Sequence, residues 1–179
     1  MYRILPAIHS LGQHLRHLQS CPEDYRPQRC PHCGKAGIWL HGHYLRKADR
    51  EGSAEGYLNP VPIPRFYCAH CRSTCSRLPA CIAPRRWYSW GIQQAVLVLL
   101  LAGNSLRRVS RRQRASRRTV GRWRAWLQAH FTQHACHLRS RFPELGRHVS
   151  LRSFWLACFR RRSLAEAMAL LDQDGVLVP

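Results

Sequence analysis

Acidic residues are scarce in this sequence and are missing from its middle. The 179 residues include 29 lysines and arginines but only nine aspartates and glutamates, and no acid lies between Tyr57 and Phe142. Lysine is also scarce, since Lys35 and Lys47 are the only two. The formal net charge of +20 calls for a polyanionic partner, first of all nucleic acid and less favourably a membrane surface. The arginine bias fits a GC-rich genome, but the planar guanidinium also matches phosphates and guanine edges.

Long apolar runs and targeting signals are missing as well. The longest apolar run, AVLVLLLA at Ala95–Ala102, is far shorter than the roughly 20 residues of a membrane span. The N-terminal stretch MYRILPAIHSLGQHLRHLQ lacks the sustained apolar core of a signal peptide. We therefore expect a soluble, cytoplasmic, nucleoid-associated protein without a membrane partner. In a reducing compartment its nine cysteines are thiols or metal ligands rather than disulfides.

Two CxxC motifs indicate a metal site. Cys30-Pro-His-Cys33 and Cys68-Ala-His-Cys71 have the spacing at which two thiolates of one tight turn reach a tetrahedral zinc ion. The gap between them is longer than the usual fifteen to twenty or so residues, but the acidic segment RKADREGSAEG lies where a hairpin tip would take up the extra length. Four thiolates close the coordination sphere and leave no place for an activated water. We expect one structural zinc ion per chain.

Other interpretations of the cysteines are weaker. A redox role for the CxxC motifs would require a βαβ context that the sequence does not offer. Four residues near the motifs stay open as substitute ligands or non-ligands: His32, His70, Cys75 and Cys81. The remaining three cysteines, Cys21, Cys136 and Cys158, lie outside any motif, and we expect them to be buried free thiols.

Composition divides the chain into four segments and predicts an α+β fold. Helical spacing of Ile8, Leu11, Leu15 and Leu18 predicts a helix over Pro6–Gln19, which CPEDYRPQ ends. The predicted segments are an N-terminal helix and linker (1–25), a small four-cysteine zinc ribbon (26–84), a helix-turn-helix (85–134) and a helical C-terminal extension (135–179).

The arginine-rich stretch Arg107–Leu127 predicts two helices joined by a turn. Its first eighteen residues contain nine arginines and no acid. The expected inner face of the first helix is Leu106, Val109, Ser110 and Gln113, and that of the second is Val120, Trp123 and Leu127. Ser105 and Ser116 are the expected N-caps, Arg114-Ala115 the turn, and Ala95–Leu101 the preceding buried helix.

Such a motif predicts how the arginines are used. The outer face of the second helix combines Arg117, Arg118 and Arg122 with the small residues Gly121 and Ala125, which fits a major groove. These three arginines are the candidates for base contacts. The candidates for phosphate contacts are Arg107, Arg108, Arg111, Arg112 and Arg124. The alternative is a solvated basic helical hairpin that binds polyanions without specificity.

The order of a CPxCG knuckle, a second CxxC, the bridge LPACIAP and an S-L-x-x-V…S-x-x-T-V-x-x-W helix-turn-helix pattern resembles the zinc-ribbon and helix-turn-helix portion of insertion-sequence transposases and their small companion regulators. The resemblance covers about residues 30–127. It implies recognition of transposon-end or operator DNA. Ser110, Gln113 and Arg114 depart from the alanine, the apolar residue and the glycine of such motifs, so the turn is expected to be wider than usual or supported by a neighbouring element.

Catalysis is not expected. A catalytic transposase of the common type needs three converging carboxylates, whereas the acids after Phe142 are Glu144, Glu166, Asp172 and Asp174 in a helical tail. Serine nucleophile elbows, phosphate-cradling loops and HExxH motifs are missing too, and no small-molecule substrate is expected. The leading hypothesis is a DNA-binding regulator or end-binding accessory factor of a mobile element, with double-stranded DNA as partner. An RNA-binding ribonucleoprotein component and a non-catalytic subunit of a recombination complex are the alternatives.

The C-terminal tail carries two apolar sets at helical spacing. They are Phe154, Trp155, Leu156, Cys158 and Phe159, and then Leu164, Ala167, Met168, Leu170 and Leu171. Ser163 and Glu166 have capping-box spacing before the second set. The tail either closes the core against Trp87, Trp90 and Trp126 or forms a homodimer interface.

Overall fold

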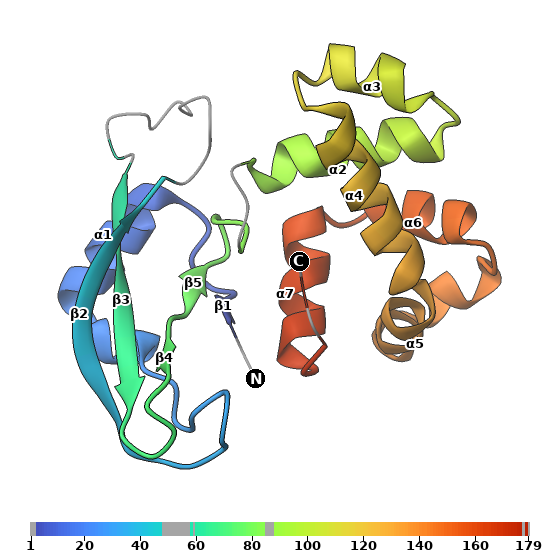
Figure 1. Cartoon of the computed structure of the whole chain (residues 1–179). Coiled ribbons are helices and arrows are strands. Elements are labelled where there is room, and N and C mark those ends of the chain that lie inside the picture. The colour runs from blue at the N-terminus through green and yellow to red at the C-terminus, as the bar shows by residue number, and fades with distance from the viewer. Residues whose placement is uncertain (1–2, 48–57, 59, 85–87, 177, 179) are drawn as a thin grey trace. The chain divides into compact units, whose positions relative to one another are not determined.

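The computed structural model describes residues 3–47, 58, 60–84, 88–176 and 178, and the chain forms two compact units (Figure 1). The N-terminal unit is Met1–Ser89 and the C-terminal unit is Trp90–Pro179. Mixed helices and small sheets confirm the expected combination of α and β structure. Most of the predicted hairpin tip (48–56) and Trp87 lie outside the described residues.

Over its described residues, the N-terminal unit combines two small sheets with one α-helix. Its elements are β1 (Ile4–Leu5), α1 (Leu11–Ser20), the 3-10 helix η1 (Pro22–Tyr25), β2 (Ile38–Arg46), β3 (Val61–Cys68), β4 (Thr74–Cys75) and β5 (Leu78–Pro79). One sheet has the antiparallel order β2-β3-β4, and β1 pairs with β5 in parallel. Strand β2 is therefore an edge strand over its whole length.

Strand β3 is the centre of the first sheet although it contains two prolines. Pro62 and Pro64 are tolerated because β4 pairs only with Phe66 and Tyr67. The stretch of β3 that contains the two prolines therefore has a partner strand, β2, on one edge only. The buried side also changes along β3, because Ile63 and Pro64 are buried in succession. Opposite this point the register of β2 shifts between Leu40 and His43. We call the half of this sheet next to the CxxC motifs the ribbon, and in it the side chains of β3 alternate between buried and more exposed positions from Pro64 to Cys68.

Helix α1 is shorter than predicted and uses a different core residue. It begins at Leu11, where the Ser10 side chain accepts a hydrogen bond from the Gln13 amide, so the predicted start at Pro6 is wrong. His14 is fully buried, whereas Leu15 is half-buried. The His14 ring bonds to the Tyr25 hydroxyl at 2.6 Å and to the Pro62 carbonyl at 2.9 Å. A carbonyl only accepts, so His14 donates through Nε2 and links the helix to β3.

The C-terminal unit is all helical over its described residues. Its elements are α2 (Trp90–Leu101), α3 (Leu106–Arg112), α4 (Arg117–Ala129), α5 (Phe131–Arg141), the 3-10 helix η3 (Pro143–Arg147), α6 (Leu151–Phe159) and α7 (Leu164–Gln173). Ser105 and Ser116 cap α3 and α4, and Ser163 and Glu166 form the predicted capping box at α7. In the part of the chain that the structure describes, no helix is long and apolar enough to cross a membrane.

The C-terminal helices pack into the same unit as the arginine-rich pair. Helices α6 and α7 both contact α2, and α7 also contacts α5. Five of their large apolar residues, Phe154, Trp155, Leu164, Met168 and Leu171, are at most 1% exposed, whereas Leu156, Phe159 and Leu170 are half-buried. The prediction that the tail closes a core is confirmed, with Trp90 buried and Trp126 half-buried in the same unit. The homodimer stays a prediction.

Candidate metal centre and candidate nucleic-acid interface

The two CxxC motifs form structurally equivalent turns. In each turn the amide after the second cysteine bonds to the carbonyl of the first, from Gly34 to Cys30 at 2.8 Å and from Arg72 to Cys68 at 2.9 Å. Gly34 and Arg72 both have positive φ, 72° and 57°. This left-handed conformation suits glycine, and arginine adopts it at a cost of about 1–2 kcal/mol. The repeated turn brings the two thiols of each motif to one side.

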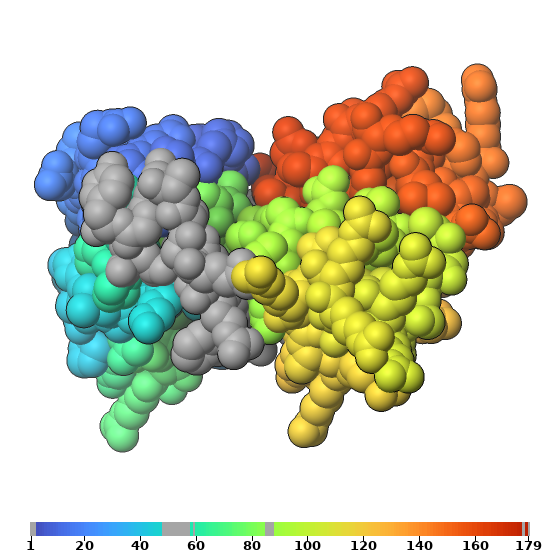
Figure 2. Space-filling view, turned by 90° about the horizontal axis from the view of Figure 1, so that it is seen from above, coloured from blue at the N-terminus to red at the C-terminus, as the bar shows by residue number. Residues whose placement is uncertain are grey.

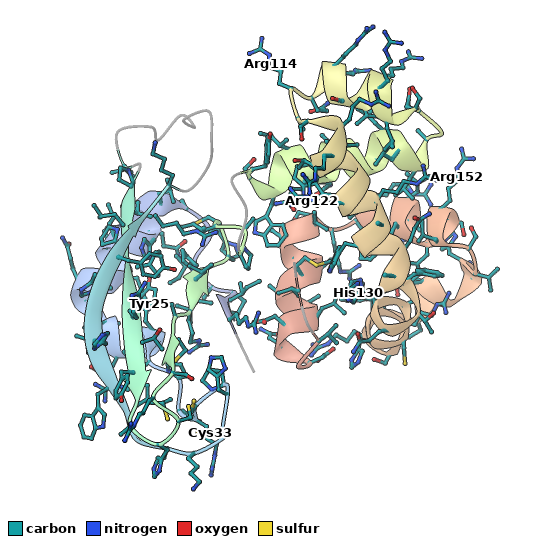
Figure 3. The ribbon with its side chains drawn as sticks, in the orientation of Figure 1. Tyr25, Cys33, Arg114, Arg122, His130 and Arg152 are labelled. Carbon is teal, nitrogen blue, oxygen red and sulfur yellow. The ribbon has the colours of Figure 1, made fainter. Side chains whose placement is uncertain are left out.

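The four predicted ligands meet in one cluster. All four sulfur atoms, of Cys30, Cys33, Cys68 and Cys71, lie within 4.8 Å of one another. The Sγ–Sγ distance is 3.5 Å between Cys30 and Cys71 and 3.7 Å between Cys33 and Cys68. A tetrahedron with metal–sulfur bonds of about 2.3 Å has edges of about 3.8 Å. The cluster therefore has the dimensions of a tetrathiolate metal site, and Figure 3 shows sulfur atoms gathered beside Cys33.

Backbone donors in the turns favour the thiolate form, which a metal requires, at two of the four cysteines. The backbone amide of Ser73, followed by its hydroxyl, lowers the pKa of the Cys71 thiol to about 6. The backbone amide of Cys71, followed by that of His70, lowers the pKa of Cys68. At Cys33 the Lys35 amide acts in the same sense, but desolvation and hydrogen bonds to the other three thiols outweigh it and raise the pKa of Cys33 to about 11. The His32 amide lies 3.4 Å from the Cys30 sulfur. Backbone donors of this kind stabilise a ligand sulfur as they would a free thiolate.

The neighbouring candidate ligands lie outside the cluster. His32 and His70 are exposed, and neither is among the four grouped ligands. Burial, followed by the charges of the cluster cysteines, raises the pKa of Cys75 to about 11, so this thiol stays protonated. Cys81 packs against the core around Ile63. Of the thiols expected to be buried, Cys158 is buried but Cys21 and Cys136 are exposed, so the prediction is wrong for those two.

A second group of potential ligands was not predicted. His17, Cys21 and Asp24 offer ligand atoms within 4.8 Å of one another at the end of α1 and in η1. His17 and Asp24 already form an ion pair at 2.8 Å between Nε2 and Oδ2. The spacing of four residues between His17, in the last turn of α1, and Cys21, its C-cap, was the sequence signal. Cys21 and Asp24 are exposed, unlike the tetrathiolate cluster with its two buried members.

The predicted pair of helices in the arginine-rich stretch is present, and it has a buried seam. Val109, Ala115, Val120, Trp123 and Leu127 are each at most 2% exposed. Between the helices Arg114 has φ of +48°, which is the conformation that a glycine adopts most easily. The Ser110 hydroxyl donates to the Ala115 carbonyl at 2.6 Å. The turn is thus supported by a side chain of α3. Ser110, which gives this support, and Arg114 are two of the residues that differ from the transposase helix-turn-helix pattern.

All nine arginines of this pair of helices are exposed. They are Arg107, Arg108, Arg111, Arg112, Arg114, Arg117, Arg118, Arg122 and Arg124. None of them forms an ion pair with a carboxylate of the described residues. Figure 2 shows long side chains projecting from the yellow surface of α3 and the start of α4, and Figure 3 shows Arg114 pointing away from the ribbon. The uncompensated charge therefore faces solvent.

Gly121 lies in the middle of α4, and no close packing within the protein requires a glycine there. A Cβ atom built there would meet no heavy atom within 4 Å. Glycine in a helix interior costs about 0.5–1 kcal/mol relative to alanine. Gly121 therefore leaves the outer surface of α4 low at its centre, next to the exposed side chains of Arg118, Arg122 and Ala125.

Carboxylates of the C-terminal unit are engaged elsewhere. Asp174 accepts a hydrogen bond from Arg141 Nε at 3.1 Å, and hydrogen bonding to Arg141 is the main cause that lowers the pKa of Asp174. Glu144 lies 3.6 Å from Arg161 and 3.8 Å from Arg162. Among the described residues, no group of three carboxylates converges on one point.

The chain thus has two parts. One unit carries two turns whose four cysteines form a cluster, and the other carries a pair of helices covered by exposed arginines. A family model described as a domain of unknown function (DUF6431) matches residues 30–123, which is more than half of the chain. The chain belongs to this family. The matched region begins at Cys30 and ends at Trp123, so it contains the four cysteines and most of the buried seam of the helix pair. No curated protein and no solved structure matches the chain.

Proposed function

We propose that the chain is a non-catalytic protein that binds double-stranded DNA through a helix-turn-helix formed by α3 and α4. The observation that carries the proposal is the exposed, uncompensated arginine surface on two helices with a fully buried seam. A basic stretch that is merely solvated needs no buried apolar residues. A helix that is held in a fixed position to fit a DNA groove needs them, because they pack it against its neighbour.

In this proposal α4 enters the major groove. Arg117, Arg118 and Arg122 contact base edges, and the low surface at Gly121 and Ala125 admits close approach. The arginines of α3, together with Arg124 on α4, hold phosphates and set the register. The resemblance to insertion-sequence transposases and their companion regulators favours a mobile-element regulator or end-binding accessory factor.

We further propose that the tetrathiolate cluster holds a structural zinc ion in a zinc ribbon. Cys30, Cys33, Cys68 and Cys71 are four soft ligands at tetrahedral spacing, a donor set that suits zinc. The ion supplies folding energy to the N-terminal unit, because the metal replaces a larger hydrophobic core. The ribbon is then a rigid support rather than a catalytic centre.

Selection of bound DNA from a random pool, followed by titration of the purified full chain, tests the function. The selected duplex should bind more tightly than a scrambled one. A duplex RNA of the same sequence should bind more weakly than the selected DNA, because the A-form major groove is too narrow for side chains. Equal affinity for all three would reject sequence recognition in favour of general polyanion binding.

A further inference from the structure

An exposed aromatic surface lies on the ribbon next to the cysteine cluster. Among the described residues the large exposed hydrophobics are Trp39, Leu40, Leu45 and Val149, and the first three are all on β2. Trp39 is 63% exposed. Most of the surface of Trp39 is therefore exposed on an edge strand, so its ring is available to a partner.

Three further side chains complete this surface. In the ribbon, the side chains of Ile38, Phe66 and Cys68 are buried. Because side chains alternate along a strand, Trp39, Arg65 and Tyr67 share the opposite side. Trp39 is the direct cross-strand partner of Tyr67.

Ring contacts extend the surface along β2. The His41 ring centroid lies 5.7 Å from that of Tyr67, and the exposed Arg65 guanidinium lies 5.1 Å from the Tyr44 ring centroid. We call Trp39, His41, Arg65 and Tyr67 the aromatic platform.

The electrostatics of the N-terminal unit favour an anion on this platform. Among its described residues the carboxylates are Glu23 and Asp24, and both are already paired, with Arg26 at 3.1 Å and His17 at 2.8 Å. Both lie in η1, whose Tyr25 packs with Ile38 and Phe66 on the buried side of the ribbon. The platform thus combines accessible rings with positive charge, and the described carboxylates of this unit belong to an element on the other side.

We propose that the aromatic platform binds unpaired bases of single-stranded nucleic acid. Every base has a π-face, so stacking on Trp39 and Tyr67 requires no particular sequence, and the Arg65 guanidinium holds the backbone phosphate or stacks in turn. Bases of an intact duplex are already stacked on each other and cannot use the platform. This surface belongs to the N-terminal unit, whereas α4 belongs to the C-terminal unit. The inference rests on the proposed function and deepens it by adding a second kind of DNA contact.

Fluorescence anisotropy titrations of the full chain test the platform. The probes are a labelled oligo(dT) of about 12 nucleotides and the selected duplex, at a salt concentration that weakens phosphate contacts. Trp39→Ala should lower the affinity for oligo(dT) about 5- to 100-fold and leave the duplex affinity unchanged. Trp39→Phe should keep most of the single-strand affinity, because the smaller ring still stacks. Leu45→Ala is the matched control, since Leu45 is 71% exposed on the same strand but offers no ring.

The outcomes separate this inference from the proposed function. Unchanged oligo(dT) affinity in zinc-loaded Trp39→Ala would overturn the platform, whatever the duplex results are. Equal losses for oligo(dT) and duplex, accompanied by a lower mass in light scattering, would replace the platform by an interface between two copies of the chain. Failure of the Arg118→Ala variant to affect duplex binding would count against α4 and leave the platform standing.

Discussion

The Ser110 hydroxyl donates to the Ala115 carbonyl, at 2.6 Å, across the turn between α3 and α4. This bond joins the last full turn of α3 to the residue before the N-cap of α4, and Ala115 is itself 2% exposed. The hydrogen bond offsets the backbone strain at Arg114, which adopts a left-handed conformation between Ser110 and Ala115. The turn thus combines a side-chain support with a strained backbone position.

Replacing Arg114 by glycine should relieve that strain. We expect Arg114→Gly to raise the free energy of unfolding of the C-terminal unit by about 0.5–1 kcal/mol, because a residue with a Cβ loses about 1–2 kcal/mol in this conformation and glycine gives back part of the gain through its flexibility. Urea unfolding followed by tryptophan fluorescence measures the change. Arg114→Ala is the control and should give no gain. A lower midpoint for Arg114→Gly would mean that the Arg114 side chain itself stabilises the turn.

Metal analysis should find one zinc ion per chain. Chelation should unfold the N-terminal unit and leave the helical signal of the C-terminal unit in circular dichroism, because the four cysteines all lie in the N-terminal unit. Cys30→Ser with Cys68→Ser should abolish binding of this ion, whereas Cys75→Ser should retain it. Zero metal in protein purified without chelators, or loss of the ion from Cys75→Ser alone, would contradict the tetrathiolate assignment.

The C-terminal unit should lose stability in mild acid because of His134. Burial, followed by the charges of His130 and His137, lowers the pKa of His134 to about 4, and its ring packs against Trp126 and Trp155. The unfolded chain takes up this proton near pH 6.5 and the folded chain only near pH 4, so stability is complete above pH 6.5 and falls as the pH drops through this window. The expected loss is about 2–3 kcal/mol.

The matched variant for this effect is His134→Phe, which keeps a ring in the aromatic cluster and cannot be protonated. Unfolding free energies at several pH values between about 4 and 7 should show a flatter profile for His134→Phe than for the wild type. Parallel profiles would show that groups other than His134 cause the acid sensitivity of the C-terminal unit.

The parts of the structure that sequence could predict depend on short-range spacing. Cys30 and Cys33 have to meet because one tight turn carries both, and Ser105 and Ser116 cap helices through residues only three positions ahead. The buried seam at Val120, Trp123 and Leu127 follows from one helical period.

Other parts depend on partners far away in the chain. His14 is buried in place of Leu15 because the Pro62 carbonyl and the Tyr25 hydroxyl hold its ring, which no local pattern records. The exposure of Trp39 depends on which side of β2 faces the core, and the register shift after Leu40 makes the alternation of this strand misleading. A tryptophan in an apolar strand is predicted to be buried from composition alone.

The two sets of arginines should respond differently to removal. If Arg118 and Arg122 contact bases, each alanine variant should lose about 1–3 kcal/mol on the selected duplex and much less on a scrambled duplex. If Arg108 holds a phosphate, Arg108→Ala should weaken both duplexes alike and reduce the salt slope by about one unit. Arg152→Ala is the control, because Arg152 is an exposed arginine on α6, outside the helix pair. Titrations at several salt concentrations give both quantities. Equal losses on both duplexes for all three test variants would show that α3 and α4 form only a polyanion-binding surface, because an arginine that contacts a base edge cannot be equally costly where that base is different.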